Sequence, residues 1–208
     1  MREGKTLFYY IIELNVKKIL ITHAVEQEQV DLYIPDAEIR VVLTGVGKAN
    51  AAMNLTAAIL EDKPDLVLNV GTAGTLKHQV GDIFMCHQFL DRDLMSLKLN
   101  GVIAELQTAV PEWVSPCSWV GQRLVTGDFH VNTGDDFVTA HADIQGDVVD
   151  MEGFAEALVC CKMGVPLIAV KYVTDVIGCN SVKLWEEKLC DARKEIKAFF
   201  EKNALFLS

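Results

Sequence analysis

Positive charge is scarce in this sequence of 208 residues. It has 19 Lys and Arg against 29 Asp and Glu, so the formal net charge at pH 7 is −10. The acidic residues are spread along the chain and do not form a tail. The negative electrostatic field of such a chain repels a phosphate backbone, which argues against a nucleic-acid partner. It also disfavours binding to anionic membranes.

The sequence also lacks the short patterns of metal and dinucleotide sites. There is no Cys-x-x-Cys pair, no Cys/His spacing that would build a zinc site and no Gly-x-Gly-x-x-Gly fingerprint. The adjacent Cys160 and Cys161 lie in an apolar segment, which is typical of buried reduced thiols. We therefore expect no metal, no organic cofactor and a reducing, cytoplasmic compartment. The six cysteines are at positions 86, 117, 160, 161, 179 and 190.

Long apolar runs are absent as well. The N-terminal run Leu7–Ile12 is too short for a transmembrane helix, and Glu13 interrupts it before any small-residue cleavage site. We therefore expect neither a secretory signal nor a membrane partner. No repeat, low-complexity stretch or linker divides the chain. The predicted organisation is an N-terminal extension of undetermined role over residues 1–17, followed by one domain over 18–208.

The sequence does contain a regular alternation of apolar strands and amphipathic helices. The predicted helices span 48–61, 150–163 and 181–206. Strands that are apolar on both faces predict an α/β fold, with a mixed, mostly parallel sheet covered by helices on both sides. Ligands of such sheets bind beyond the carboxyl ends of the strands. The predicted strands are 18–23, 39–43, 65–70, 83–89, 123–126 and 165–173.

Two of these strand ends carry residues suited to chemistry. The segment Gly71-Thr72-Ala73-Gly74 follows a strand, and its glycines would let the backbone approach an anion or a sugar. A tight packing turn is the alternative. Asp175 ends the last strand, where partial desolvation would favour the protonated carboxyl and let it donate a proton near neutrality. Capping of the next segment is the alternative there.

Two further groups of carboxylates are ambiguous on spacing alone. Asp150-Met151-Glu152 opens a helix, where the helix dipole favours carboxylates whatever their function. In a functional interpretation, Glu152 accepts hydrogen bonds from sugar hydroxyls while Met151 packs on the sugar face. Glu26 and Glu28 follow the first strand and are either solvated surface charges or part of the site.

Taken together and in this order, the motifs resemble the purine nucleoside phosphorylase/hydrolase family. Within it, the chain is most similar to the 5′-methylthioadenosine/S-adenosylhomocysteine nucleosidases. The resemblance covers roughly Lys18 to Gly178. It implies a three-layer α/β/α sandwich, cofactor-independent hydrolysis of the bond between a purine and a ribose-type sugar, and a homodimer. The motifs are Gly45-Val46-Gly47-Lys48, Asn69–Gly74, Gly81-Asp82-Ile83, Thr126-Gly127-Asp128, Val149–Glu152 and Thr174-Asp175.

The resemblance implies catalytic roles for two carboxylates. Asp175 would protonate N7 of the purine, with Thr174 beside it. Glu28 matches the acidic residue after the family's first strand and would position and deprotonate the attacking water. Thr72 stands where the family has a serine near the sugar and the water. Protonating the base makes it a better leaving group, an effect typically of about 10²–10⁴ in rate.

The resemblance also implies a set of substrate contacts. Glu152 would hold the ribose hydroxyls, with Met151 against the sugar. Val131 would offer backbone groups to the edge of the base. The ring that stacks on the base would come from position 130 or 129. The remaining candidate substrate-binding residues are His130, Phe129, Val46, Ala73 and Gly74.

Two departures from the family pattern widen the range of possible functions. His130 stands where these nucleosidases usually have a phenylalanine, and Lys171 where an arginine is common. A hydrolase for a futalosine-type nucleoside and a relative that binds nucleosides without turnover are both compatible with these substitutions. A phosphorylase would need arginines for phosphate, yet none flanks Gly71 or directly precedes His23. The acidic residues after the first strand favour water over an anion as nucleophile.

Overall fold

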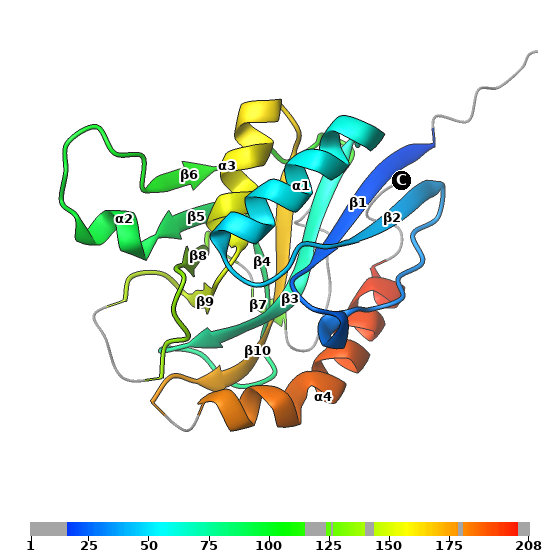
Figure 1. Ribbon diagram of the computed structural model, residues 1–208. Coiled ribbons are helices and arrows are strands. Elements are labelled where there is room, and N and C mark those ends of the chain that lie inside the picture. The colour runs from blue at the N-terminus through cyan, green and yellow to red at the C-terminus, as the bar shows by residue number, and fades with distance from the viewer. Residues whose placement is uncertain (1–15, 115–123, 126, 140–143, 179–180, 204–208) are drawn as a thin grey trace, which may run out of the picture.

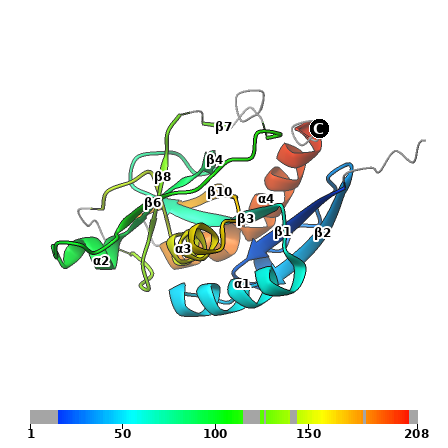
Figure 2. The same cartoon turned by 90° about the horizontal axis from the view of Figure 1, so that it is seen from above.

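A single mixed sheet runs through the molecule and carries helices on both faces (Figures 1 and 2). This computed structural model describes residues 16–114, 124–125, 127–139, 144–178 and 181–203. The central strands β3 (Leu66–Thr75) and β10 (Leu167–Val176) pair in parallel over most of their length. Both are largely apolar and buried, because helices cover the sheet on each side of them.

The other strands extend the sheet on both sides of this central pair. From one edge the order is β6-β5-β8-β9-β3-β10-β4-β7, while β1 pairs with the first half of β3 and β2 lies outside β1. The pairs β10–β4, β3–β9 and β5–β6 are antiparallel, and the other pairs are parallel. The remaining bounds are β1 (Lys17–His23), β2 (Ala37–Leu43), β4 (Ile83–Cys86), β5 (Gln88–Asp91), β6 (Glu105–Gln107), β7 (Leu124–Val125), β8 (His130–Thr133) and β9 (Val148–Asp150).

Three helices form the outer layers. Helices α1 (Lys48–Asp62) and α3 (Gly153–Met163) lie together on one face, and α4 (Ser181–Lys202) covers the other (Figure 2). Strand alternation divides the apolar residues between two cores. Ile19 and Ile21 belong to the core that includes Phe200 of α4, whereas Leu20 belongs to the core that includes Phe154 of α3. Two short helices, η1 (Glu26–Glu28) and α2 (Arg92–Ser96), follow β1 and β5.

The structure refines the elements predicted from sequence. The predicted strand over 83–89 is two strands, β4 and β5, which pair with different neighbours. The predicted helix over 150–163 begins at Gly153, because Asp150 is still the last residue of β9. Strands β6, β8 and β9 were not predicted. The run Leu7–Ile12 lies outside the described residues. Within the residues that are described, no helix has both the length and the apolar character needed to cross a bilayer.

Candidate active site

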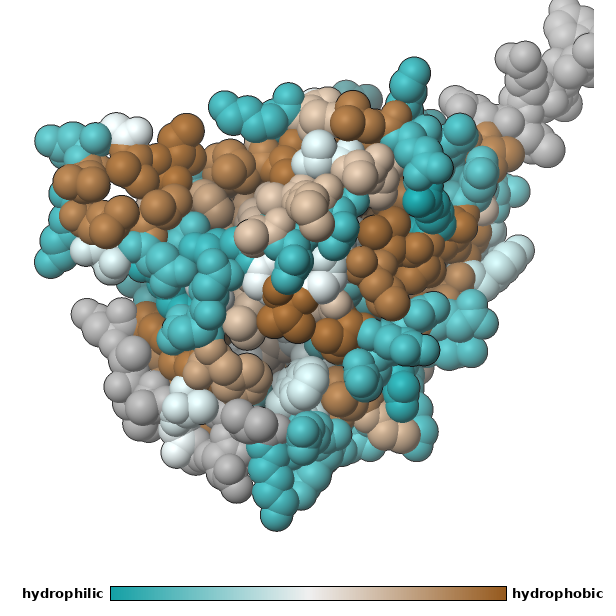
Figure 3. Space-filling model, in the orientation of Figure 1, coloured by the Kyte–Doolittle hydropathy of each residue, from teal (hydrophilic) through white to brown (hydrophobic). Residues whose placement is uncertain are grey.

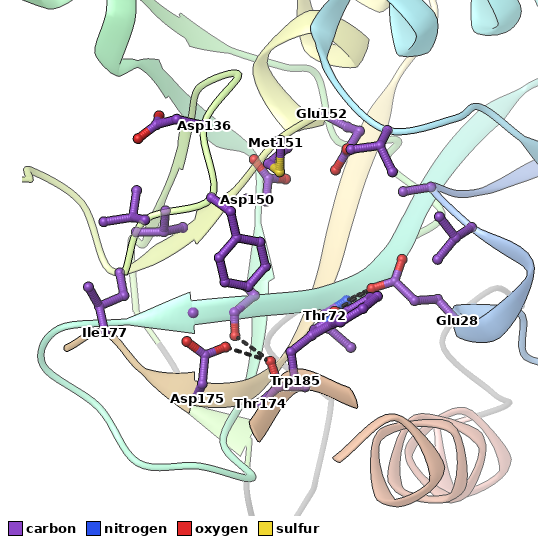
Figure 4. Close-up of a pocket in the computed structure, with 18 residues that line it drawn as sticks. Glu28, Thr72, Asp136, Asp150, Met151, Glu152, Thr174, Asp175, Ile177 and Trp185 are labelled. Atoms are coloured by element: carbon purple, nitrogen blue, oxygen red, sulfur yellow. Dashed lines mark hydrogen bonds between the residues drawn. The ribbon is translucent and has the colours of Figure 1, made fainter. Parts of the chain in front are cut away.

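A cavity opens where the carboxyl-terminal parts of β3, β9 and β10 meet (Figure 4). Segments after β1 and before α1 close it on one side, and α4 reaches it from the other face of the sheet. This is the edge at which a ligand was expected. The described lining residues are Ala24, Val25, Glu28, Val46, Thr72, Ala73, Gly74, Asp136, Phe137, Val138, Val149, Asp150, Met151, Glu152, Thr174, Asp175, Ile177 and Trp185.

Asp175 is directed into this cavity by an irregularity at the end of β10. The pairing of β10 with β3 shifts register between Val173 and Asp175, and such a bulge re-aims the side chains around it. The hydroxyl of Thr174 donates a 2.9 Å hydrogen bond to Oδ1 of Asp175. A Cβ at Gly74 would lie 3.2 Å from Oδ2 of Asp175, so the glycine leaves the space that the carboxylate occupies.

Glu28 reaches the cavity from η1 and is held by β3. Its Oε1 accepts the backbone N–H of Thr72 at 3.0 Å and also the Thr72 hydroxyl. The side chain is largely buried, with the residue 8% exposed. A Cβ at Gly71 would lie 3.4 Å from Oε2 of Glu28, so this glycine also makes room for a carboxylate. The two glycines of the Gly-Thr-Ala-Gly segment therefore accommodate the two carboxylates that were predicted to be catalytic.

Glu152 lies at the N-terminus of α3 and faces the same cavity (Figure 4). Its Oε1 accepts the backbone N–H of Gly47 at 2.8 Å, which ties α3 to the start of α1. Burial raises the pKa of Glu152 to about 8, with the charge of Asp150 adding to the effect and Lys171 opposing it. The neighbouring Met151 presents an apolar side chain to the cavity.

A buried ion pair supports this end of α3. The Lys171 Nζ lies 2.9 Å from Oδ2 of Asp150, and both side chains are almost fully buried. The same carboxylate accepts the backbone N–H of Gly153 and the hydroxyl of Thr133. Burial disfavours the ammonium form of Lys171, but the neighbouring carboxylates outweigh it and raise the lysine pKa above its usual value. Lys171 thus preserves a positive charge at a position where the resembled family commonly has arginine.

A second buried carboxylate, Glu156, lies one turn further along α3. Its Oε2 accepts hydrogen bonds from the Thr22 hydroxyl at 2.7 Å and from the Asn69 amide at 3.0 Å. Burial raises the pKa of Glu156 to about 7, although these donors and the charge of Lys171 oppose the shift. The folded protein therefore holds this proton up to a higher pH than the unfolded chain does.

This shift predicts that the protein becomes less stable as pH rises. The contribution of Glu156 is fully present below its ordinary pKa of 4.5 and is lost as pH rises through about 7. The expected loss is about 3 kcal/mol in the free energy of unfolding. Urea unfolding at pH 5 and pH 8 should show a smaller loss in Glu156→Gln than in wild type. The exposed Glu195→Gln should match wild type, and equal losses in all three proteins would contradict the prediction.

The structure brings nine of the predicted site residues to one cavity. These come from five separate segments of the chain and include the three carboxylates on which the hypothesis depends. Glu26, the neighbouring acidic residue after the first strand, is exposed. The nine residues are Glu28, Val46, Thr72, Ala73, Gly74, Met151, Glu152, Thr174 and Asp175.

The segment from Phe129 to Val131 is not among the lining residues. Val131 is fully buried in β8, and both edges of that strand are paired in the sheet, with β5 and with β9. The Phe129 ring packs edge-on against Phe84, with 4.9 Å between centroids. His130 lies on the same strand and approaches Glu105, with its Nε2 4.0 Å from the carboxylate. Val131 therefore lies within the sheet and the Phe129 ring packs against the core, and the described lining of the cavity includes neither of them nor His130.

Two aromatic side chains line the cavity that were not predicted from the sequence. Phe137 lies in the segment after β8, and Trp185 lies in α4, ten positions after Asp175. An aromatic residue soon after the acidic strand end was the available signal for Trp185. For Phe137 the signal was its place after the polar Gly134-Asp135-Asp136.

The charges around the cavity have one sign. Among the described lining residues, every acidic or basic side chain is a carboxyl group, and neither Lys nor Arg is present. Across the described parts of the chain, no group of three or more His, Cys, Asp or Glu side chains is arranged to hold a metal ion. The cavity therefore suits a ligand that is neutral or that acquires positive charge, more than one that carries phosphate.

Comparison with known proteins places most of the chain in one family. The family model described as the phosphorylase superfamily matches residues 11–205. The 5′-methylthioadenosine/S-adenosylhomocysteine nucleosidase of Exiguobacterium sp. is 27% identical over 187 residues, covering 78% of this chain and 80% of the relative. The enzyme of the same name from Marinomonas sp. is 27% identical over 166 residues, covering 70% and 71% of the two chains.

Solved structures show the same architecture. The crystal structure of the nucleosidase of that name from Colwellia psychrerythraea, in complex with adenine, has a TM-score of 0.73 at 22% identity and covers 92% of this chain and 95% of its own. The S. pneumoniae nucleosidase, with a transition-state inhibitor, has a TM-score of 0.71 at 20% identity and covers 92% and 100%. The likeness confirms the three-layer α/β/α fold with a mixed central sheet.

Proposed function

Because the chain belongs to the phosphorylase superfamily, we propose that it hydrolyses the N-glycosidic bond of a purine nucleoside. The substrate is an adenine nucleoside such as 5′-methylthioadenosine or S-adenosylhomocysteine, and the products are the free base and the sugar. The names of the curated relatives support this substrate class, as does the adenine complex of the Colwellia enzyme.

One observation carries the proposal: Glu28, Glu152 and Asp175 converge on one cavity that has no cationic side chain among its described lining residues. Breaking the bond between a sugar and a base develops positive charge on the sugar and negative charge on the base. Carboxylates around the sugar stabilise that cationic transition state, as they do in glycoside hydrolysis. A phosphorylase would place a phosphate anion among the same carboxylates, which is unfavourable without arginine or lysine.

At the base, Asp175 acts as the general acid. Its proton passes to N7 of the purine as the bond between the sugar and N9 breaks, so that the electron pair of that bond leaves on a neutral base. The hydrogen bond from Thr174 leaves Asp175 oriented toward the cavity. Ile177 lies beside Asp175, away from Glu28 and Trp185, so the base occupies that side (Figure 4).

At the sugar, Glu152 accepts hydrogen bonds from the ribose hydroxyls and Met151 packs against the ring. Glu28 binds the water and takes its proton as the oxygen forms a bond to the anomeric carbon. The anchoring of Oε1 by two donors from Thr72 supports this role, because it holds the carboxylate in one orientation. Neither half of the reaction needs a metal or an organic cofactor.

The proposal extends to the setting of the enzyme. We place it in the cytoplasm, consistent with unpaired thiols at Cys86, Cys160, Cys161 and Cys190. Residues 18–208 form the catalytic domain and residues 1–17 an extension. A homodimer would cover exposed apolar side chains around α2 and β6, where apolar side chains gather on the surface (Figure 3). Those side chains are Leu97, Leu99, Val102 and Ile103.

The direct test is release of base from a panel of purine nucleosides in phosphate-free buffer. We expect free adenine from 5′-methylthioadenosine, at a rate that added phosphate does not increase. Reaction in ¹⁸O-labelled water should place the label on the anomeric hydroxyl of the sugar. Dependence of the rate on phosphate, with a sugar phosphate as product, would show a phosphorylase instead. Tight binding of adenine nucleosides with no release of base would show a binding protein.

A further inference from the structure

Three distant segments meet at the water side of the cavity. Trp185 comes from α4, Thr72 from β3 and Glu28 from η1, and α4 packs against both of the other elements. The indole Nε1 of Trp185 lies 2.9 Å from the Thr72 hydroxyl oxygen. That hydroxyl also bonds to Oε1 of Glu28. The three side chains thus form a continuous hydrogen-bonded chain from a helix on one face of the sheet to the carboxylate (Figure 4).

The chemistry of the three groups gives this chain one direction. An indole N–H can only donate, and a threonine hydroxyl has a single hydrogen. Because the hydroxyl of Thr72 accepts the bond from Trp185, its own hydrogen is free to point to the other neighbour, Glu28. An ionised carboxylate is an acceptor only, so it completes the sequence. Donation therefore runs from Trp185 through Thr72 to Glu28.

This direction determines which oxygen of Glu28 is available for chemistry. Both bonds from Thr72, from its N–H and its hydroxyl, end on Oε1. Oε2 is the oxygen near Gly71, and a Cβ added at this glycine would lie 3.4 Å from it. Among the described residues, none donates a hydrogen bond to Oε2. Oε2 is therefore the oxygen that can accept a proton from a water molecule in the cavity.

We propose that Trp185 is a positioning residue for the reaction: through the Thr72 hydroxyl it holds the ionised Glu28 with Oε2 toward the attacking water. The inference rests on the proposed function, in which Glu28 is the base. Without the indole N–H, the hydroxyl of Thr72 can rotate and share its hydrogen with water. The carboxylate then loses part of its orientation. Trp185 touches neither of the reacting atoms in this scheme and acts on them through Thr72.

The simpler alternative is that Trp185 is only an apolar wall of the cavity. Phenylalanine keeps most of that wall but has no N–H, so Trp185→Phe separates the two roles. We expect kcat to fall about 5- to 10-fold, which corresponds to the loss of one hydrogen bond, with KM changed less than about threefold. If Trp185 were only an apolar wall that contacts the substrate, the substitution would change KM instead of kcat. Trp113→Phe is the matched control, because Trp113 packs beside Lys17, outside the cavity, and its loss should leave both constants unchanged.

A double-mutant cycle with Thr72→Val tests whether Trp185 acts through the hydroxyl. Valine preserves the shape of threonine but removes the oxygen, so the relay no longer exists. In that background Trp185→Phe should change kcat less than about twofold, because coupled residues are not additive. In a Thr72→Ser background, which keeps the hydroxyl, the full 5- to 10-fold loss should return. An equal loss in the Thr72→Val background would overturn the proposal.

The hydrogen-bonded chain can also be measured without turnover. The indole N–H signal of Trp185 is identified by its loss in Trp185→Phe in a spectrum of the ¹⁵N-labelled protein. We expect Glu28→Gln to move this signal, because neutralising the carboxylate weakens the polarisation of the Thr72 hydroxyl. Glu26→Gln, two positions away and exposed, should leave it in place. If the signal does not move in Glu28→Gln, the relay is overturned, even when the wild-type protein releases base normally. If the signal moves but the wild-type protein releases no base, the result counts against the proposed function alone.

Discussion

Replacing Asp175 by asparagine is expected to lower the rate of base release by about 10²–10⁴, the usual contribution of a general acid. Asparagine has nearly the same shape as aspartate but no proton to give to N7. The Thr174 hydroxyl, 2.9 Å from Oδ1 in the wild type, can still donate to the amide oxygen. The fold should therefore survive, with an unchanged circular dichroism spectrum and a melting temperature close to that of wild type.

The matched control for this substitution is Asp31→Asn, at an exposed position away from the cavity. It makes the same chemical change and should leave the rate within about twofold of wild type, as surface substitutions usually do. Single-turnover measurements with 5′-methylthioadenosine would isolate the step in which the bond breaks. A near-normal rate for Asp175→Asn would remove Asp175 from the role of acid, and a different donor would have to protonate the base.

The largest expected effect on stability comes from Lys171→Met. This substitution removes the positive charge that lies 2.9 Å from Asp150 in the interior. It leaves a buried carboxylate without its counter-ion, with Glu152 and Glu156 also nearby. Breaking one partner of a buried ion pair typically costs about 3–5 kcal/mol. Urea unfolding should show a loss of this size, and thermal unfolding a fall of about 10 °C.

Two companion variants make this result interpretable. Lys183→Met removes an exposed charge, 3.6 Å from Glu187, and should cost less than about 0.5 kcal/mol. The double variant Lys171→Met with Asp150→Asn should recover part of the loss, because no uncompensated charge then remains buried. If Lys171→Met proved as stable as wild type, the pair would contribute no net stability.

The central strands were predictable because their signal is local. The apolar run over 165–173 gave β10, and the run over 65–70 gave the first half of β3, which continues to Thr75. Strands β8 and β9 were missed because they are short, and Asn132 and Thr133 interrupt any apolar pattern. Their pairing with β5 and with β3 comes from segments far apart in the sequence. That information is not present in any short window.

The residues of the candidate site also divide into those with a local sequence signal and those whose place depends on tertiary packing. Asp175 was predictable because it ends an apolar strand, and the carboxyl ends of neighbouring parallel strands lie at one edge of the sheet. The position after the first strand suggested both Glu26 and Glu28, and only the family resemblance singled out Glu28. Trp185 was not predictable, because its place depends on how α4 docks on the opposite face. The expectation for Val131 came from the family resemblance, and in the structure this residue lies inside the sheet, between its register partners on β5 and β9. Tertiary pairing therefore accounts for both the missed aromatic and the displaced segment.

Helix α4 contributes both to the hydrophobic core and to the lining of the cavity. Its later turns place Ala192, Ile196 and Phe200 in the core beneath the sheet, while its early part brings Trp185 to the cavity. An α-helix rotates by about 100° per residue, so inserting one residue between these two parts would swing the indole away from the Thr72 hydroxyl. The number of residues between Trp185 and the core residues is therefore fixed, because it sets the direction in which the indole points from the helix. The helix can vary in sequence more freely than in length.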